Sequence, residues 1–249
     1  MYLAASNKCF PELTFEAALP KLVDLEYTRI EIPFHEADYG IRPSDVAQDP
    51  ERAITACRQT QRLTPIAFDI QINATGNDHY SQFSAICAVA KATKVITLIV
   101  RSGDLGTPFN AEVEHLQQLV DIASTDGMVV AIRTEAGKIS EDPDTVKVLC
   151  DHIKGLAVAL DPSHFYFGEM AGRSYEPIIP YTQHVYLRDT NKDNMQVRVG
   201  QGDVEYGRLI SLLAQNKYSR ALTVDMQPMP DVDQMAELRK IRLLIESLL

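Results

Sequence analysis

The stretch from Met128 to Phe165 reads MVVAIRTEAGKISEDPDTVKVLCDHIKGLAVALDPSHF and forms one complete strand–helix–strand unit. Short apolar runs at its two ends predict β-strands, and each run is followed by a carboxylate, first Glu135 and then Asp161. Between them, Asp142-Pro143 is typical of a helix start, because the aspartate caps free amides and proline needs no donor there. The unit therefore predicts two parallel strands joined by a helix.

Comparable units follow one another along the whole chain. Short apolar segments predict eight strands, over Tyr2–Ala5, Arg29–Pro33, Pro65–Ile70, Val95–Val100, Met128–Thr134, Leu156–Leu160, His184–Leu187 and Ala221–Val224. Amphipathic helices are expected in most of the intervals, including Leu13–Leu25, a helix after Asp49-Pro50, Ala111–Ser124 preceded by Asn110, and Asp233–Leu248.

Eight such units in 249 residues predict a (β/α)8 TIM barrel in which residues 1–249 form one domain. The competing architecture is a doubly wound open sheet, which ordinarily carries a glycine-rich turn after its first strand. Here the first predicted strand leads into SNKCFPEL, which contains no glycine. This difference favours the barrel.

The composition and charge of the chain limit the kinds of molecule that it is expected to bind. The formal net charge of −10 and the pI of about 5.1 argue against general binding of nucleic acid. The four scattered cysteines lack metal-binding spacing and indicate reduced thiols. The N-terminus lacks the features of a signal peptide, and no apolar run approaches the roughly 20 residues of a membrane span. We therefore expect a soluble cytoplasmic protein with no membrane partner.

The candidate site residues follow from where strands end, because a barrel builds its site at the carboxyl ends of its strands. Glu135 shares a strand face with Arg133, so both are expected at the mouth, although Glu135 could equally be a solvated loop carboxylate. Asp161 and His164 are three residues apart on a turn, which suits a divalent cation or a carboxylate that orients a histidine. Alternatively, Asp161 caps the turn and His164 is only packed.

The segment HVYLRDT places His184, Tyr186 and Arg188 on one strand face. An inward arginine at a strand end suits a substrate carboxylate or phosphate, or an ion pair with a carboxylate such as Glu135. Asp225 follows the last predicted strand and is either a ligand or the partner of a barrel cation.

Two weaker candidates complete the set. The loop VRVGQGDVEYG contains Gly200 and Gly202, which allow close approach to a ligand, with Arg198 beside them, although a lone GxG is usually a turn. Glu31 and His35 extend toward the mouth from the second strand, with either an acid–base or a structural role.

Together, RTEAG, LDPSHF, HVYLRDT, VRVGQGDVEYGRLI and LTVDMQP resemble the xylose isomerase-like TIM-barrel superfamily of sugar phosphate isomerases and epimerases. The resemblance implies one divalent metal ion, commonly Mn, Mg, Co or Zn. Carried over, the ligands are Glu135, Asp161 and Asp225, with His164 as a substitute. Tyr186 stands where the superfamily has a histidine ligand, and Asp225 where it has a glutamate, so the implied metal site is weakened.

The resemblance implies an isomerase or epimerase of carbohydrate metabolism that acts on a small sugar or sugar phosphate. The metal would polarise a carbonyl and its adjacent hydroxyl, and Glu135 and Asp225 would move the proton. Substrate-binding residues would be Glu31, His184, Tyr186, Arg188 and Arg198, together with His164. Two alternatives stay open: a degenerate sugar-binding or regulatory barrel, and a metal-dependent dehydratase of a cyclic hydroxy acid, whose carboxylate Arg133 and Arg188 would bind. Relatives are often dimers or tetramers, so a homo-oligomer is a further expectation.

Overall fold

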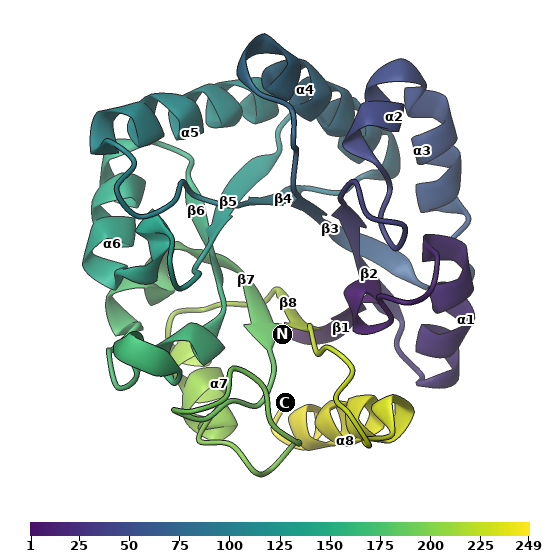
Figure 1. Ribbon diagram of the computed structural model, residues 1–249, viewed down its shortest axis with the longest axis vertical. Coiled ribbons are helices and arrows are strands. Elements are labelled where there is room, and N and C mark those ends of the chain that lie inside the picture. The colour runs from purple at the N-terminus through teal and green to yellow at the C-terminus, as the bar shows by residue number, and fades with distance from the viewer.

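In the computed structural model, which describes all residues 1–249, eight parallel strands close into a barrel in sequence order (Figure 1). The strands are β1 Tyr2–Ser6, β2 Arg29–Phe34, β3 Thr64–Ile70, β4 Thr97–Val100, β5 Val129–Arg133, β6 Ala157–Leu160, β7 Thr182–Leu187 and β8 Ala221–Val224. Closure comes from β1 pairing with β8, where Tyr2 lies opposite Ala221 and Ala5 opposite Val224. The predicted barrel and all eight predicted strands are confirmed, each within two residues at either end.

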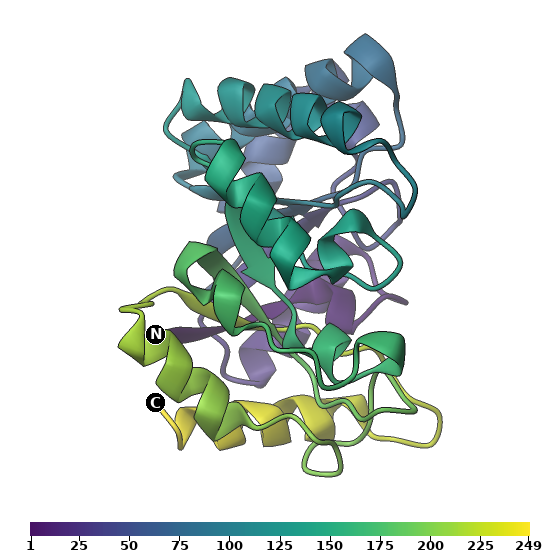
Figure 2. The same ribbon diagram turned by 90° about the vertical axis from the view of Figure 1, so that its left-hand side faces the viewer.

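The helices surround the barrel on its outside (Figures 1 and 2). They are α1 Phe15–Asp24, α2 Pro43–Gln48, α3 Pro50–Arg58, α4 Gly76–Thr93, α5 Phe109–Ser124, α6 Pro143–His152, α7 Tyr206–Gln215 and α8 Gln234–Glu246. The predicted caps Asp49 and Asp142 both accept a hydrogen bond from the backbone amide three residues later. Each therefore satisfies an amide at the helix start that has no intrahelical partner.

One helix prediction needs correction, and one interval between strands contains no α-helix. Asn110 does not precede its helix, because α5 begins at Phe109 and Pro108 is the N-cap residue. The proline fixes its own backbone φ at −57° and the following residue is already helical, so Asn110 lies inside the first turn. Between β6 and β7 the chain forms short 3-10 turns rather than an α-helix, since Pro177 and Pro180 limit regular hydrogen bonding there.

The core has two parts with different compositions. Large aliphatic and aromatic side chains fill the space between the strands and the helices. Inside the barrel the apolar side chains are mostly alanine, with one isoleucine and one tyrosine, and comprise Ala67, Ile99, Ala131, Ala157, Ala159 and Tyr186. Alanines leave space along the barrel axis, and long charged side chains from the strand ends extend into it.

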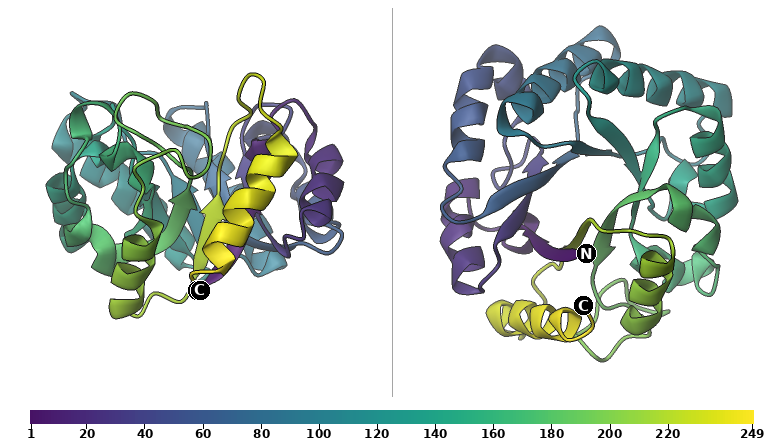
Figure 3. Two further views of the ribbon diagram at one scale, coloured as in Figure 1. Left: turned by 90° about the horizontal axis from the view of Figure 1, so that it is seen from below. Right: turned by 180° about the vertical axis from the view of Figure 1, so that it is seen from behind.

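The two chain termini lie close together at the amino-terminal end of the strands, on the left in Figure 2 and in the foreground of the rear view in Figure 3. Helix α8 runs beside β8 and β1 and brings the chain back toward its start (Figure 3). The opposite end of the barrel, where the strands terminate, is therefore formed by loops. None of the helices combines the length and apolar composition that crossing a bilayer requires.

Candidate active site at the barrel mouth

All eight strands contribute charged or polar side chains at or just beyond their carboxyl ends. These side chains surround a cavity of about 270 Å³ at the barrel mouth. Its lining is Lys8, His35, Tyr39, Gln71, Arg101, Arg133, Glu135, His164, Arg188, Met195, Asp225 and Gln227. Such a lining, rich in donors and acceptors, suits a small polyhydroxylated ligand better than an apolar one.

Lys8 and Asp69 form the centre of one half of the mouth. The Lys8 Nζ lies 2.6 Å from Asp69 Oδ2, 3.1 Å from Asp225 Oδ2 and 3.8 Å from Glu31 Oε1. Burial disfavours the charge on Lys8, but the carboxylates of Asp225 and Asp69 outweigh it and raise the pKa of the ammonium group. Lys8 is therefore a permanent cation and hydrogen-bond donor, not a neutral amine nucleophile.

Arg133 is the centre of the other half. It ends β5 with a side chain that is almost fully buried, and its Nη2 lies 2.6 Å from Asp161 Oδ2 and 2.9 Å from Asp225 Oδ2. Arg188 also forms an ion pair with Asp161 Oδ2. Burial would raise the pKa of the Asp161 carboxyl, but Arg188 and Arg133 hold it well below its usual range.

Asp225 joins the two halves, because its Oδ2 contacts both Lys8 and Arg133. Burial again opposes ionisation, and these two cations nevertheless lower the pKa of the carboxyl. The sequence left two interpretations open for Asp225, a metal ligand or the partner of a barrel cation. Its contacts in the structure are those of the second. A carboxylate held this way is a weak base at neutral pH.

Glu135 is paired with a cation that neither Asp161 nor Asp225 contacts. It follows the last residue of β5 by two positions, and its Oε2 lies 2.9 Å from Arg101 Nε. Its side chain is 30% exposed, whereas those of Asp69 and Asp161 are fully buried and that of Asp225 is 5% exposed. Glu135 is thus the mouth carboxylate most open to a ligand, but it has no contact with Asp161 or Asp225.

His164 lies beside Asp161 and faces the cavity. Its Nδ1 accepts a hydrogen bond from the amide of Ala136 at 3.0 Å, and its Nε2 lies 3.6 Å from Asp161 Oδ2. Burial, helped by the positive charges of Arg188 and Arg133, outweighs Asp161 and lowers the pKa of the imidazole to about 4. His164 is therefore neutral at pH 7 with its proton on Nε2, ready to donate to a ligand oxygen.

Beneath the cavity, Tyr186 and His184 occupy the barrel interior on one strand face, as predicted, with ring centroids 5.0 Å apart. His184 Nε2 lies 2.9 Å from Glu31 Oε2, and both side chains are buried. Burial and the charges of Asp69 and Glu31 raise the pKa of Tyr186 well above its ordinary value, so the phenol stays neutral. Glu31 and His184 lie below the lining of the mouth cavity and do not form part of it.

The glycine loop is not brought to the cavity. The amides of Gly200 and Gly202 donate to Asp189 Oδ2 at 2.6 and 3.1 Å, so an internal carboxylate occupies the place that a ligand would take. Arg198 is exposed and donates to the carbonyl oxygen of Asp231. The loop therefore matches the turn that was the alternative interpretation.

A divalent metal ion does not fit the predicted ligand set as these side chains are arranged. No three histidine, cysteine or acidic side chains are grouped to hold a metal. The carboxylates of Asp161 and Asp225 are bound by buried cations, and Glu135 is paired with Arg101. The phenol hydroxyl of Tyr186 has no hydrogen-bond partner, and its ring face lies against Arg133 instead.

Three charged residues of the mouth were missed by the sequence reasoning: Lys8, Asp69 and Arg101. Asp69 contacts Lys8, Arg101 Nη1 at 2.9 Å and His35 Nε2 at 3.3 Å, so it organises half of the site. The signal was present, because Asp69 and Arg101 lie at the ends of β3 and β4, where the same strand-end rule applies.

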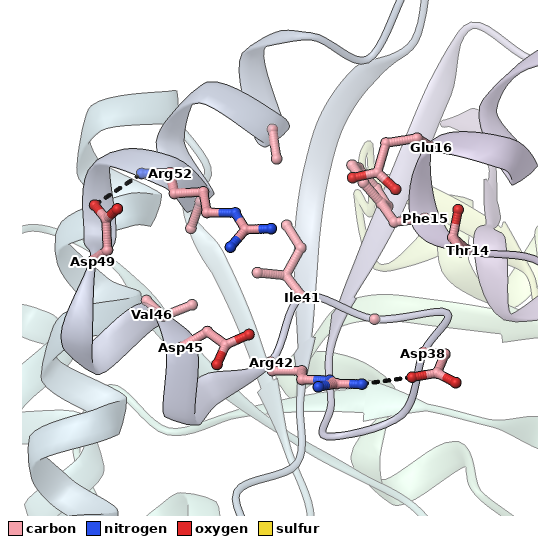
Figure 4. Close-up of a pocket in the computed structure, with 13 residues that line it drawn as sticks. Thr14, Phe15, Glu16, Asp38, Ile41, Arg42, Asp45, Val46, Asp49 and Arg52 are labelled. Carbon is pink, nitrogen blue, oxygen red and sulfur yellow. Dashed lines mark hydrogen bonds and ion pairs between the residues drawn. The ribbon is translucent and has the colours of Figure 1, made fainter.

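A larger cavity, of about 360 Å³, lies away from the mouth between α1 and the α2–α3 segment (Figure 4). Figure 4 shows the Arg52 side chain pointing into it, with Glu16 and Asp45 nearby. The apolar part of its lining, which includes Phe15 and Ile41, comes from helix and loop residues. No strand end contributes to it, so we assign the candidate site to the mouth.

Comparisons with known proteins agree with this architecture. Residues 19–245 match the family described as xylose isomerase-like TIM barrel. A crystal structure of apo 3-keto-D-glucoside 4-epimerase from E. coli superposes with a TM-score of 0.75 at 11% identity, covering 99% of both chains. The IolI protein with a bound zinc atom gives 0.77 at 15% identity, covering 100% of this chain and 98% of that one.

A probable 3-DHS dehydratase from Bacillus anthracis also superposes, with a TM-score of 0.71 at 11% identity and 98% coverage of each chain. No curated protein sequence is significantly similar to the chain. Because the family match spans most of the sequence, this chain belongs to the xylose isomerase-like TIM-barrel family. At such low identities the structural similarity establishes the fold alone.

Proposed function

We propose that the chain is an isomerase or epimerase of a small sugar or sugar derivative, and that it moves a proton on a carbon next to a carbonyl. The observation that carries the proposal is Glu135, the mouth carboxylate that is substantially exposed to the cavity. Its position supports a role as the base. The polar cavity around it supports a polyhydroxylated ligand, and the family's sugar-processing structures agree with this class.

In this mechanism Glu135 takes the proton from the α-carbon, and the electrons of the broken C–H bond move to the carbonyl oxygen. Lys8 and the arginines provide positive charge near that oxygen, and the neutral His164 donates its Nε2 proton as a hydrogen bond to it. The resulting enediolate oxygen takes the proton of the hydroxyl on the α-carbon, the carbonyl re-forms at the α-carbon, and Glu135 returns its proton to the former carbonyl carbon. A single base of this kind favours an aldose–ketose isomerisation, since epimerisation requires delivery to the opposite face.

Asp225, the second catalytic residue predicted from the sequence, is better suited to holding Lys8 and Arg133 in place. Charge balance at the mouth, and directly beneath it where Glu31 lies, also bears on the substrate. Five carboxylates face four permanent cations, and each cation already pairs with at least one carboxylate. This balance supports an uncharged sugar more than a sugar phosphate.

The predicted metal ion remains a prediction, suggested by the zinc-bound relative and not supported by the ligand arrangement described above. The dehydratase hypothesis has less support, because Asp161 already neutralises part of the charge of Arg133 and Arg188, although the Nε of Arg188 has no partner. A binding protein without turnover is the second candidate. It is favoured by the internal pairing of Asp161 and Asp225, which leaves Glu135 as the one open base.

The test is proton exchange with solvent. Chelator-treated protein is incubated in D2O with a panel of aldoses, ketoses, 3-keto sugars and hydroxy acids, and deuterium next to the carbonyl is detected by NMR. We expect exchange on at least one sugar, reduced about 100-fold or more in Glu135→Gln. The exposed Glu169→Gln is the matched control and should retain the full rate.

Exchange that is unchanged in Glu135→Gln contradicts this mechanism. Saturable binding of a sugar, seen as a rise in melting temperature, without exchange for any compound favours the binding protein. Exchange or water loss confined to the hydroxy acids favours the dehydratase.

A further inference from the structure

The side chain of Arg133 lies among the three positions at the ends of β6, β7 and β8 where the family resemblance expects metal ligands. Its Nη2 is 2.6 Å from Asp161 Oδ2 and 2.9 Å from Asp225 Oδ2. Its Cζ lies 3.8 Å from the centroid of the Tyr186 ring. One guanidinium therefore contacts all three side chains.

We infer that Arg133 is a built-in cation that replaces the divalent metal ion at this barrel mouth, with Asp161, Tyr186 and Asp225 forming a guanidinium site.

The first argument is competition for the same oxygens. A divalent ion needs carboxylate oxygens at about 2.0–2.6 Å, in place of the hydrogen bonds that these oxygens already make. Asp161 Oδ2 and Asp225 Oδ2 are bound to one guanidinium, and Arg188 and Lys8 contact the same two atoms. A metal ion there would lie within a few ångströms of three permanent positive charges.

The second argument is the orientation of Tyr186. A phenol coordinates a metal through its oxygen, whereas an aromatic ring attracts a guanidinium through its face. Arg133 lies over the ring face, and the hydroxyl group has no hydrogen-bond partner. A tyrosine at this position does more than remove a histidine ligand. Its ring also provides the surface against which the Arg133 guanidinium lies.

The third argument is that Arg133 cannot easily leave. It is only 4% exposed, and its partners come from three different strands. Removing one member of such a buried ionic group leaves uncompensated charge, which is strongly unfavourable. A metal ion would have to displace a cation that the fold itself holds in place.

Metal binding, measured without turnover, tests this inference independently of the proposed function. Chelator-treated protein is titrated with MnCl2 and with ZnCl2 by calorimetry, and its melting temperature is recorded with and without each metal. For the natural sequence we expect no saturable binding at the mouth and no rise in melting temperature. Micromolar, stoichiometric binding that Asp161→Ala abolishes would overturn the inference.

Restoring ligands should create a metal site. In Arg133→Glu/Tyr186→His, a carboxylate and an imidazole join Asp161 and Asp225, and the affinity for Mn or Zn should rise by more than about tenfold. The matched control is Arg101→Glu/Tyr186→His, which makes the same charge change at a strand end that has no contact with Asp161 or Asp225. The metal affinity of this control variant should rise much less. An equal gain in the two variants, or no gain in a folded first variant, contradicts the inference.

A milder variant covers the case in which the double substitution does not fold. Arg133→Gln removes the charge but keeps a hydrogen-bond donor, so Asp161 and Asp225 become available. We expect Mn to raise the melting temperature of Arg133→Gln and not that of the natural sequence. Identical responses of the two proteins to Mn would count against the role assigned to Arg133.

Discussion

His164 illustrates how one residue combines local structure and charge. The amide of Ala136 fixes which ring nitrogen accepts, and burial beside two arginines keeps the ring neutral. The pKa of the ring is about 4 in the folded chain, against 6.5 as the ordinary value. Between these values the unfolded chain binds more protons, so stability must fall as the pH falls from about 6.5 toward 4.

We predict that His164→Asn reduces this pH dependence. Asparagine can still accept from Ala136 but does not titrate. The loss of unfolding free energy between pH 7 and pH 5 should shrink by about 2 kcal/mol, measured by urea unfolding at the two pH values. Part of the pH dependence should remain in this variant, because burial also lowers the pKa values of His79 and His115.

The matched control for this prediction is His152→Asn, an exposed histidine at the end of α6. It should keep the pH dependence of the natural sequence, because its side chain lies in solvent. If His164→Asn and His152→Asn behave alike, His164 is not held neutral by its surroundings.

Sequence reasoning identified several individual mouth residues but not their partners. The strand-end rule identified Glu135, Asp161 and Asp225, since each follows an apolar run. It did not reveal that Arg133 binds two of them, because these contacts join residues 28 and 92 positions apart in the sequence. Lys8 was missed because it lies in the short turn Asn7–Cys9 after β1, where periodicity gives no direction for a side chain.

At the level of elements, the glycine loop after β7 is held in place by hydrogen bonds from its backbone amides to Asp189. A Cβ atom on Gly202 would lie 2.1 Å from Asp189 Oδ1 and 2.6 Å from the Thr190 carbonyl oxygen. By contrast, a Cβ on Gly207, in the first turn of α7, meets nothing within 4 Å. The same substitution should therefore have opposite effects at these two positions.

We predict that Gly202→Ala destabilises the protein by about 1–3 kcal/mol, because the loop must shift to relieve the clash. Gly207→Ala should stabilise it by about 0.5 kcal/mol, because alanine loses less conformational entropy in a helix. Urea unfolding of both variants provides the measurement. A similar effect of both substitutions would show that Asp189 does not fix the loop.

Strands and helices were easier to predict than loops for a physical reason. Burial of β4 or β6 on both sides requires a continuous apolar run, and helix caps require particular side chains, so both leave a local record in the sequence. The β6–β7 connection and the start of α5 depend on prolines, whose effect changes with the exact position at which the helix begins.

For the molecule as a whole, Lys8 joins parts of the barrel that are far apart in sequence. Its ammonium group contacts carboxylates from β2 and β3 and the one that follows β8, inside a closed ring of strands. Lys8 is the cation that all three of these buried anions share, while Arg101 also pairs with Asp69 and Arg133 also pairs with Asp225. Losing that cation should affect the stability of the entire fold.

We predict that Lys8→Met lowers the unfolding free energy by about 3–5 kcal/mol at pH 7, because the buried carboxylates lose their partner. The loss should be smaller at pH 5. Without Lys8 the pKa values of the Asp69 and Asp225 carboxyl groups rise in the folded chain, so the folded variant takes up protons that the natural protein does not. Urea unfolding at both pH values measures the difference.

The comparison variant is Lys91→Met, which removes an exposed lysine paired with Asp126 at 2.6 Å. Despite its short distance, this surface ion pair should contribute less than about 1 kcal/mol and should show little change between pH 7 and pH 5. Equal losses in Lys8→Met and Lys91→Met would mean that the mouth carboxylates do not need the buried cation. A clear difference would instead show that charge balance inside the ring of strands helps to hold the barrel together.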